Sequence, residues 1–372
     1  MSDLYPAERL ARAAEAAQAA GLAALLLTPG PELRYLTGYD AHLSERLTCL
    51  VVPAMSEPFL IVPRLEQPAA VASPASRMGL EITGWDETDD PYALLAGRLG
   101  LAGGGPRAVG VADRMWALMV LRLRDALPGT GQVLAGPVLT GMRVRKSAAE
   151  VDALRAAGAA IDRVHQRVPG WLRPGRTERE VAADISGAIV AEGHARTDFA
   201  IVASGPNAAS PHHEPSDRML APGDAVVVDI GGTMPSGYCS DCTRTYAIGS
   251  PPPEFAAYYE VLARAQDAAC AAVRPGVPAE AVDAAARDPI TAAGYGRYFI
   301  HRTGHGIGLE THEDPYLVAG NSEPLAPGMA FSVEPGIYPG PHGARIEDIV
   351  VCTDGGCDRL NNVTRDLVVV EG

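Results

Sequence analysis

The sequence predicts two domains: an α/β domain over residues 1–142, then an α+β domain over residues 143–372 that contains an internal pseudo-two-fold duplication. Three observations support this prediction. The chain has 372 residues, which exceeds the usual length of one domain. Short apolar runs alternate with helical patterns in the first part. The second part holds two pairs of matching segments that follow each other in the same order.

The N-terminal domain is expected to begin with an Ala-rich helix over residues 6–20 that ends at Gly21. An apolar run over residues 22–27 predicts a buried strand, and Pro29-Gly30-Pro31 predicts a turn after it. The later elements predicted in this domain are strands over residues 47–52, 59–62 and 108–112 and a helix over residues 115–126. This part of the sequence contains no metal-ligand cluster and no phosphate-binding loop.

The boundary is placed at Arg143, near the end of a strand-like stretch over residues 138–144. Two capping-box patterns then each begin a predicted helix: Ser147 with Glu150, and Thr177 with Glu180. The elements predicted after them are strands over residues 199–202, 225–230 and 238–248, helices over residues 254–273 and 279–293, and further strands in the last third.

The duplication rests on two matches. Residues 220–231 match residues 325–336 at an offset of 105, and Arg173-Pro174-Gly175 matches the Arg-Pro-Gly that begins at residue 274, at an offset of 101. Coincidence in an Ala-rich chain is the alternative, but two matches in the same order favour duplication. Asp229 and Glu334 take equivalent places in the two repeats, so we expect one site on the pseudo-two-fold axis to which both halves contribute.

Composition and charge exclude some classes of partner. The net charge of -14 argues against nucleic acid and against an anionic membrane surface. The first residues lack a basic stretch and the apolar run over residues 23–27 is too short to span a bilayer, so we expect a cytoplasmic protein without a membrane partner. Cys239 and Cys242 have C-x-x-C spacing, but no second such pair exists. The six cysteines are therefore interpreted as small buried residues in a reducing compartment.

The residues that carry chemistry concentrate between residues 301 and 347. His301, His305 and His312 lie among glycines that leave room for a substrate, and Glu334 and Glu347 follow at apolar segments. A buried carboxylate is costly unless a positive group meets it. Imidazole and carboxylate together suit Mn, Zn, Fe or Co, so a metal ion is the simplest such group.

The first half supplies matching ligands. Asp229 ends an apolar run, residues 231–237 form a turn, and the strand that returns should place Asp241 opposite Asp229. Singly, Asp229 could be a turn residue and Glu347 an ion-pair partner of Arg345. Four carboxylates and one imidazole are enough to hold two divalent cations, and the candidate ligands are Asp229, Asp241, His305, Glu334 and Glu347.

Nearly the whole chain resembles the metallopeptidases of the pita-bread fold, which include methionine aminopeptidase, aminopeptidase P and Xaa-Pro dipeptidase (prolidase). The matching segments are Asn207, the His212 segment, Asp229-x-Gly, residues 237–245, the His-Gly-Ile-Gly stretch from His305, residues 333–336 and residues 345–348. The resemblance implies the five ligands above for two divalent ions, with Mn expected and Co, Zn or Fe as alternatives. Asp241 and Glu347 would bridge the ions. One extra residue between Asp229 and Asp241, compared with many members, falls in the turn.

The N-terminal domain distinguishes the subfamilies. Methionine aminopeptidases usually lack a large domain of this kind, creatinase lacks the full ligand set, and residues 33–39 look like the prolidase and aminopeptidase P type. The resemblance therefore implies a peptidase that hydrolyses the bond before proline, most closely a dipeptidase, with aminopeptidase P acting on longer peptides as the alternative. It also implies a homodimer. A non-catalytic binding module or a structural scaffold would leave the complete ligand set without a purpose.

Further roles follow from the same resemblance. Glu334 would be general base and acid as well as ligand, and His301 an outer-shell group or proton relay. His212 and His312 would bind substrate and donate to the carbonyl or the tetrahedral oxyanion, the alternative for His301 and His312 being buried core imidazoles.

Two arginines are expected to bind substrate. Arg345 lies in a motif that enzymes acting on longer peptides also carry, so it cannot favour dipeptides. An arginine fork fits a free carboxylate best, and Arg46 of the N-terminal domain is therefore our candidate for the group that recognises the carboxylate after proline. A solvated charge at the start of a strand is the alternative for Arg46.

Overall fold

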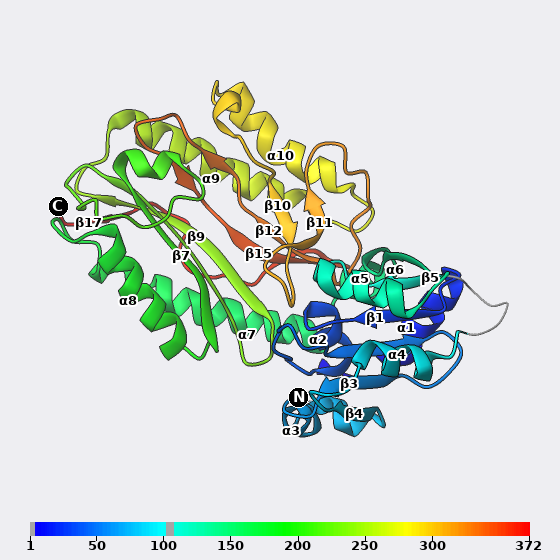
Figure 1. The fold of residues 1–372 in the computed structure, drawn as a ribbon. Helices are drawn as coiled ribbons and strands as arrows, with labels where there is room; N and C mark the ends of the chain where they lie inside the picture. Colours follow the sequence, from blue (N-terminus) through cyan, green and yellow to red (C-terminus); the bar gives the residue numbers. More distant parts are fainter. Residues whose placement is uncertain (1–3, 102–107) are drawn as a thin grey trace. The chain divides into compact units, whose positions relative to one another are not determined.

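The computed structural model describes residues 4–101 and 108–372 of the chain. It divides into two compact units, Met1–Arg143 and Val144–Gly372 (Figure 1). The fold class is as predicted: an N-terminal α/β unit is followed by a larger unit of helices and antiparallel sheets.

The N-terminal unit is built on a six-stranded mixed sheet in the order β4-β3-β2-β1-β5-β6. Its strands are β1 (Ala24–Leu27), β2 (Cys49–Pro53), β3 (Phe59–Pro63), β4 (Glu81–Trp85), β5 (Ala108–Val111) and β6 (Gly131–Leu134). Its helices are α1 (Glu8–Ala19), α2 (Pro31–Thr37), α3 (Gln67–Ala72), α4 (Pro91–Leu99), α5 (Ala117–Ala126) and α6 (Gly136–Arg143). β1 is wholly buried, and it lies between β2, which is antiparallel to it, and β5, which is parallel.

One expected strand in this unit is wrong. Residues 138–144 lie mainly in helix α6, which buries Leu139 and Met142. These two residues are three positions apart, so a helix turns both toward the core, whereas a strand would point them to opposite faces. Strands β4 and β6 were not predicted, and most of their residues are partly or fully exposed, so their sequences lack the continuous apolar run of a central strand.

The C-terminal unit consists of two halves of similar design (Figure 1). In the first half, α7 (Ala148–His165) and α8 (Glu178–Ala191) accompany a sheet in the order β17-β9-β8-β7. In the second, α9 (Pro253–Ala272) and α10 (Ala279–Ala292) accompany a sheet in the order β11-β10-β12-β15-β16. Figure 1 shows α7 and α8 on one side of the unit, α9 and α10 on the other, and the sheets between them. Both predicted capping boxes are formed, so α7 and α8 begin where the sequence indicated.

Apart from β17, the strands of this unit run antiparallel to their neighbours, and most of their residues are buried. The first sheet holds β7 (Arg196–Ser204), β8 (Ala225–Thr233), β9 (Cys239–Ile248) and β17 (Val368–Val370). The second holds β10 (Gly304–Gly306), β11 (Glu313–Leu317), β12 (Ala330–Val333), β15 (Asp348–Thr353) and β16 (Gly356–Arg359), and β13 (Gly336–Ile337) pairs with β14 (Ala344–Arg345). β17 crosses from the end of the second half into the first sheet, where it pairs with β9 in parallel.

Equivalent hydrogen bonds recur in the two halves. The N–H of Gly175 donates to the carbonyl of Leu220, and the N–H of Gly276 donates to that of Leu325. Donors and acceptors are displaced by the 101 and 105 residues that separate the sequence repeats. Each Arg-Pro-Gly turn thus docks on the Leu-Ala-Pro-Gly turn of its own half. The duplication is therefore present in three dimensions, as the sequence predicted.

All six cysteines are free, and five of them are buried. Among residues 4–101 and 108–372, no helix has both the length and the apolar character needed to cross a membrane.

Candidate active site

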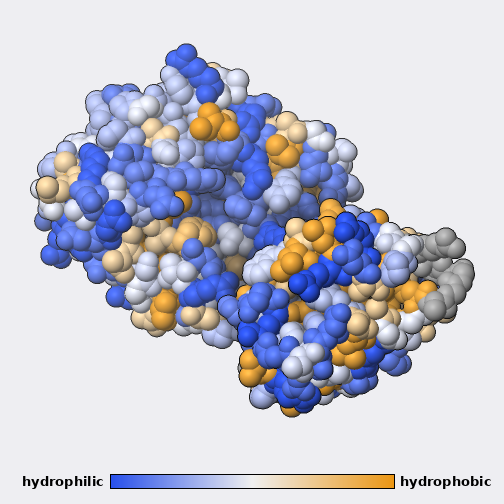
Figure 2. Space-filling model, in the orientation of Figure 1, coloured by the Kyte–Doolittle hydropathy of each residue, from blue (hydrophilic) through white to orange (hydrophobic). Residues whose placement is uncertain are grey.

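A cavity of about 740 Å³ lies in the C-terminal unit and is lined by residues of both halves. In Figure 2 the face of this unit is hollowed, and mainly hydrophilic residues surround the hollow. The predicted site residues that line the cavity are His212, Asp229, Asp241, His301, His305, His312, Glu334, Arg345 and Glu347. Only Arg46 of the predicted set lies elsewhere, in the N-terminal unit.

Asp229 and Asp241 come from the two central strands of the first sheet. The sequence predicted a strand that ends at Ile230, just after Asp229, and it placed Asp241 opposite Asp229. The structure corrects both points: β8 continues to Thr233, Asp229 pairs with Thr243, and Asp241 pairs with Gly231. The strand is longer than its apolar run because Gly231 and Gly232 continue the ladder. The two carboxylates are diagonal neighbours on one face of the sheet, which still brings them to the same cavity.

His305 lies in the short central strand β10, between two glycines. A Cβ on Gly304 would collide with the carbonyl of Ser332, and one on Gly306 with the carbonyls of Asp314 and Glu313. The interpretation of the glycines of this segment as room for a substrate does not account for these two. At these two positions they instead allow neighbouring strands to approach closely on both sides of His305.

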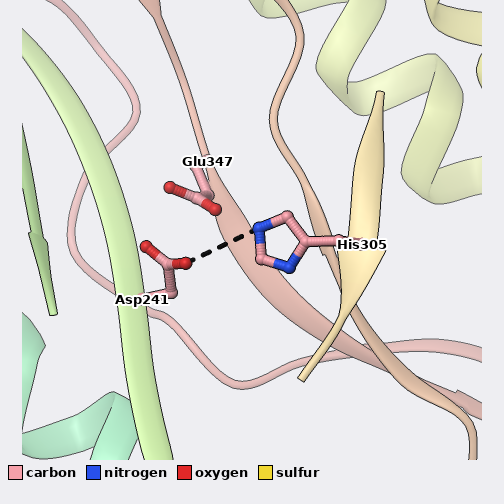
Figure 3. A group of neighbouring side chains, drawn as sticks. All are labelled: Asp241, His305 and Glu347. Carbon is pink, nitrogen blue, oxygen red and sulfur yellow. Dashed lines mark ion pairs between the residues drawn. The ribbon is translucent and has the colours of Figure 1, made fainter. Parts of the chain in front are cut away.

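The tautomer of His305 follows from its contacts. Its Nδ1 lies 3.1 Å from the carbonyl of Gly306, which can only accept, so Nδ1 carries the proton. The lone pair on Nε2 then faces Glu334 Oε1 at 3.1 Å and Asp241 Oδ2 at 3.7 Å. Figure 3 shows the imidazole pointing between the carboxylates of Asp241 and Glu347. This is the orientation in which a histidine can bind a metal ion.

Glu334 and Glu347 come from the second half. Glu334 follows β12 directly, and the Ser332 hydroxyl donates to its Oε1 at 3.1 Å. Glu347 lies between β14 and β15, where Thr243 Oγ1 donates to its Oε2 at 2.8 Å. The N–H of Glu347 also donates to the carbonyl of Thr243, so strand β9 of the first half fixes this segment of the second.

The carboxylates concentrate negative charge in a buried place. Burial raises the pKa of Asp241 well above its usual range, and the charges of Glu347, Asp229 and Glu334 raise it further. Burial and then the charges of Glu334 and Asp229 do the same for the pKa of Glu347. Burial alone would raise the pKa of Glu334 too. A protonated His305, whose Nε2 would then donate to Glu334, lowers this pKa to about 2. A metal ion bound to Nε2 would take the place of that proton. The site therefore holds more negative charge than the neighbouring cations neutralise.

The donor set fits a divalent cation. One ligand atom each from Asp241, His305 and Glu347 lie within 4.8 Å of one another, a group that could hold a metal ion. Asp229 Oδ1 is buried, and among the described residues no donor reaches it. A buried carboxylate oxygen without a donor is costly, and a metal ion in the cavity would supply the missing partner.

The remaining histidines surround this cluster. Nδ1 of His301 lies 2.7 Å from the carbonyl of Arg302 and therefore donates, so Nε2 accepts from the Tyr338 hydroxyl at 3.0 Å. Burial lowers the pKa of His301. The ring of His312 packs edge-on against that of His305, with 4.1 Å between centroids. Partial burial, and then the charge of His305, lower the pKa of His312 to about 4, so it is a neutral imidazole near pH 7.

The two predicted substrate-binding arginines already have partners. Arg345 is buried and donates to Asp229 Oδ2 at 2.6 Å, and it also donates to Thr243 and Tyr338. Together with a bond to the carbonyl of Pro211, these contacts use four of the five N–H groups of Arg345, which leaves one N–H of Nη2 for a substrate. Arg46 forms ion pairs with Glu87 at 2.7 Å and with Glu45 at 2.8 Å, at the surface of its unit.

The cavity also contains residues that were not predicted. Asp198, Phe199 and Ile201 of β7 line it, as does Thr311. Ile201 pairs with Asp229 across the ladder, so its side chain shares the face that carries the acid. Tyr338, which contacts both His301 and Arg345, was missed as well. Detection of the residues of β7 required the strand register, which the sequence alone does not provide.

The fold and the cavity together define a class, a two-domain metal-dependent hydrolase whose metal ligands would come from both halves of one duplicated unit. The model for the Creatinase/Prolidase N-terminal domain matches residues 9–145, and the model for Metallopeptidase family M24 matches residues 152–354. The chain belongs to metallopeptidase family M24, and its C-terminal unit is a pita-bread domain.

Named relatives cover nearly the whole chain. It is 57% identical over 365 residues to "Probable dipeptidase PepE" of Mycobacterium tuberculosis, which involves 98% of this chain and 96% of the relative. It is 36% identical over 345 residues to "Xaa-Pro dipeptidase" of Lactobacillus helveticus, which involves 91% and 92%. The crystal structure of dipeptidase PepE from Mycobacterium ulcerans superposes with a TM-score of 0.92 at 58% identity, covering 100% of this chain and 99% of that one.

Proposed function

We propose that the chain is a metallopeptidase of the Xaa-Pro dipeptidase type, which releases free proline from dipeptides with two divalent ions in its site. The observation that carries this proposal is one buried cavity with four carboxylates and a histidine whose Nε2 is free to bind metal, flanked by His212, His301 and His312. Relatives named dipeptidase and Xaa-Pro dipeptidase support the substrate class.

The proposed ligands are Asp229, Asp241, His305, Glu334 and Glu347, and the resemblance to the family implies that Asp241 and Glu347 would be shared by the two ions. Oxygen and imidazole donors suit Mn, with Co, Zn and Fe as alternatives. When bound, such ions lower the pKa of a water molecule and polarise the scissile carbonyl.

The side chains around the ligands then carry the proton transfers. Glu334 takes the proton of the attacking water and returns it to the proline nitrogen, which has no hydrogen in the Xaa-Pro bond and must gain one to leave as an amine. His312 and His212 donate hydrogen bonds to the carbonyl oxygen as it becomes an oxyanion. His312 suits this task because its lowered pKa keeps it neutral, with one N–H, at neutral pH. His301 and Tyr338 form a hydrogen-bonded pair beside Glu334 that can steady or relay its proton.

Two arginines are proposed for substrate binding. Arg345 holds Asp229 and lines the cavity, where it can contribute positive charge to a bound peptide. Arg46 remains our candidate for the carboxylate after proline, and its pairs with Glu45 and Glu87 are surface contacts, which are individually weak and can be exchanged. Aminopeptidase P activity on longer peptides is the alternative. It needs the same metal site, and it differs only in that no protein group binds a free carboxylate directly after proline.

Two further parts of the proposal concern assembly and location. We infer a homodimer from the resemblance to the family, and sedimentation at micromolar concentration tests it: a fully active monomer would contradict the inference. We also place the protein in the cytoplasm, because six free cysteines suit a reducing compartment. Fractionation of the source cells tests that placement.

The function is tested with matched peptides. Purified protein with Mn²⁺ or Co²⁺ is incubated with Met-Pro, Gly-Pro, Met-Ala and Met-Pro-Gly, and free proline or the new amine is quantified. Cleavage of Met-Pro and Gly-Pro with little cleavage of Met-Ala and Met-Pro-Gly is the expected result. Equal cleavage of Met-Pro-Gly would favour aminopeptidase P, and cleavage of Met-Ala alone would overturn the requirement for proline.

A further inference from the structure

The buried carboxylate of Glu178 accepts hydrogen bonds from four residues of one segment, residues 204–216. Glu178 is the first residue of α8 and is 0% exposed. Its donors are the N–H and hydroxyl of Ser204 (2.8 and 2.7 Å), the amide of Asn207 (3.0 and 3.2 Å), the ring of His213 (2.8 Å), and the N–H and hydroxyl of Ser216 (3.0 and 2.6 Å). We call these five residues the Glu178 cluster.

The partners of Glu178 are hydroxyl, amide and backbone N–H groups and one imidazole. Among the described residues no lysine or arginine pairs with Glu178, and its charge is met by neutral groups and by His213. Burial would raise its pKa, but the hydrogen bonds from Ser216 and Ser204 lower it to about 2, so the group is a carboxylate at working pH. A buried carboxylate is stable only while its hydrogen-bond donors stay in place. Glu178 therefore fixes the conformation of the segment that supplies these donors.

The segment held in this way carries part of the cavity wall. Pro211 and His212 both line the cavity, and they lie between Asn207 and His213 of the cluster. The segment begins at Ser204, the last residue of β7, and beyond it the described structure has only a short 3-10 turn over Gly205–Ala209. On the side of the cavity, Arg345 donates to the carbonyl of Pro211 at 3.2 Å. His212 is therefore carried by a loop whose position depends on Glu178 behind it and on Arg345 beside it.

In the second half, a different acidic residue holds the segment that carries cavity histidines. Thr177 and Pro278 form equivalent bridges, so the counterpart of Glu178 is Ala279, which cannot accept such bonds. Instead Asp283 of α10 accepts from the N–H and hydroxyl of Thr303, which lies between His301 and His305. In each half, a buried acid on the helix after the Arg-Pro-Gly turn thus holds the segment that carries cavity histidines.

We infer that Glu178 is a positioning residue, which sets the place of His212 for the reaction without touching substrate. The inference rests on the proposed function and adds to it, because no residue of the Glu178 cluster has a catalytic, metal-binding or substrate-binding role in that proposal. A substitution of Glu178 should therefore lower activity in a protein that has His212, and should have little effect in a protein that lacks it.

The variant Glu178→Gln tests this with little change of shape. Each oxygen of Glu178 accepts from a backbone N–H, Oε1 from Ser204 and Oε2 from Ser216. A glutamine must present its NH₂ to one of these two N–H groups in either orientation, so one backbone donor always faces another donor. We expect kcat/KM for Met-Pro to fall about 10²-fold, as a displacement of about 1 Å in an active site can cause.

A double-mutant cycle separates positioning from general damage. If Glu178 acts through His212, Glu178→Gln should cost little further activity in a His212→Ala background. Multiplied losses, or a Glu178→Gln enzyme with unchanged kcat/KM, would overturn the inference. Metal content should be unchanged in all variants. Glu180→Gln is the matched control, because Glu180 lies on the same first turn, is exposed and caps Thr177, so the kcat/KM of this variant should equal that of the wild type.

Two additions keep the test decisive. If Glu178→Gln does not fold, Ser216→Ala removes one donor, and we expect a loss of about fivefold, as for one hydrogen bond, that also disappears in the His212→Ala background. If the wild type does not cleave Xaa-Pro peptides, the proposed function fails while the inference remains testable. The rate at which diethylpyrocarbonate modifies His212, mapped by mass spectrometry, should then change several-fold in Glu178→Gln and not in Glu180→Gln. Equal rates in all three proteins would overturn it.

Discussion

Replacement of His165 by glutamine should make the stability of the C-terminal unit less sensitive to mild acid. His165 is the last residue of α7 and is buried, and its Nε2 donates to the carbonyl of Cys242 while Nδ1 accepts from the Tyr246 hydroxyl, both at 3.0 Å. Burial, and then the charge of Arg244, lower its pKa from 6.5 to about 3. A glutamine amide can donate and accept in the same two directions, but it does not titrate.

The sign and size follow from linkage between protonation and folding. Between pH 6.5 and pH 3 the unfolded chain binds a proton at His165 and the folded chain does not, so stability is complete above pH 6.5 and falls as pH decreases. Each pH unit below 6.5 costs about 1.4 kcal/mol. Between pH 7 and pH 5 the wild type should therefore lose roughly 2 kcal/mol from this residue alone.

The measurement is urea unfolding of metal-free protein at several pH values from 5 to 8. Trp171 is the one tryptophan of the C-terminal unit, so a Trp85→Phe, Trp116→Phe background lets its fluorescence report on that unit. The comparison of interest is the change in unfolding free energy with pH, because any fixed cost of the substitution is the same at each pH. Parallel pH profiles for His165→Gln and its parent would refute the assignment of this titration to His165.

Four other outcomes follow from the site. Exhaustive chelation should abolish activity and Mn²⁺ or Co²⁺ should restore it, with two ions per chain by metal analysis; a fully active metal-free enzyme would contradict this. Glu334→Gln should reduce kcat far more than it reduces metal content, and near-normal kcat would exclude the proton-transfer role. His312→Ala should lower kcat about 10²-fold with unchanged thermal stability, whereas a loss of stability alone would indicate a core imidazole. Arg46→Ala should raise KM for dipeptides, largely spare kcat and reduce the preference over tripeptides, and unchanged kinetics on both lengths would remove Arg46 from the site.

The acids and histidines of the cavity could be located from sequence because each lies in a short segment of distinctive composition. Their arrangement could not be read with the same accuracy. Asp229 and Asp241 are diagonal neighbours and not opposite ones, since β8 continues past the apolar run that seemed to end it. Gly304 and Gly306 are required because the backbone of neighbouring strands lies where a Cβ would be. Those strands come later in the chain, so the local sequence does not reveal this requirement.

Other residues were beyond sequence reasoning for similar reasons. Phe199 and Ile201 share the face of Asp229 only because of the register between β7 and β8. The role of Glu178 could not be predicted, because the capping box of Thr177 and Glu180 already explained the acidic residues at the start of this helix. Nothing in the local sequence indicated that Glu178 itself is buried. Residues 138–144 have apolar spacings that suit a helix as well as a strand, and packing of Leu139 and Met142 decided the outcome.

Strand β17 has a consequence for the order of events during synthesis. β9, which carries Asp241, ends at Ile248, but the strand that pairs with its outer edge comprises Val368–Val370. At about 5–20 residues per second a ribosome needs roughly 6–24 s to make the chain between them. Throughout that time an apolar strand edge of the nascent protein is unpaired, and such edges are prone to pair with other chains. A chaperone that covers this edge until the last strand emerges would therefore reduce aggregation of the nascent chain.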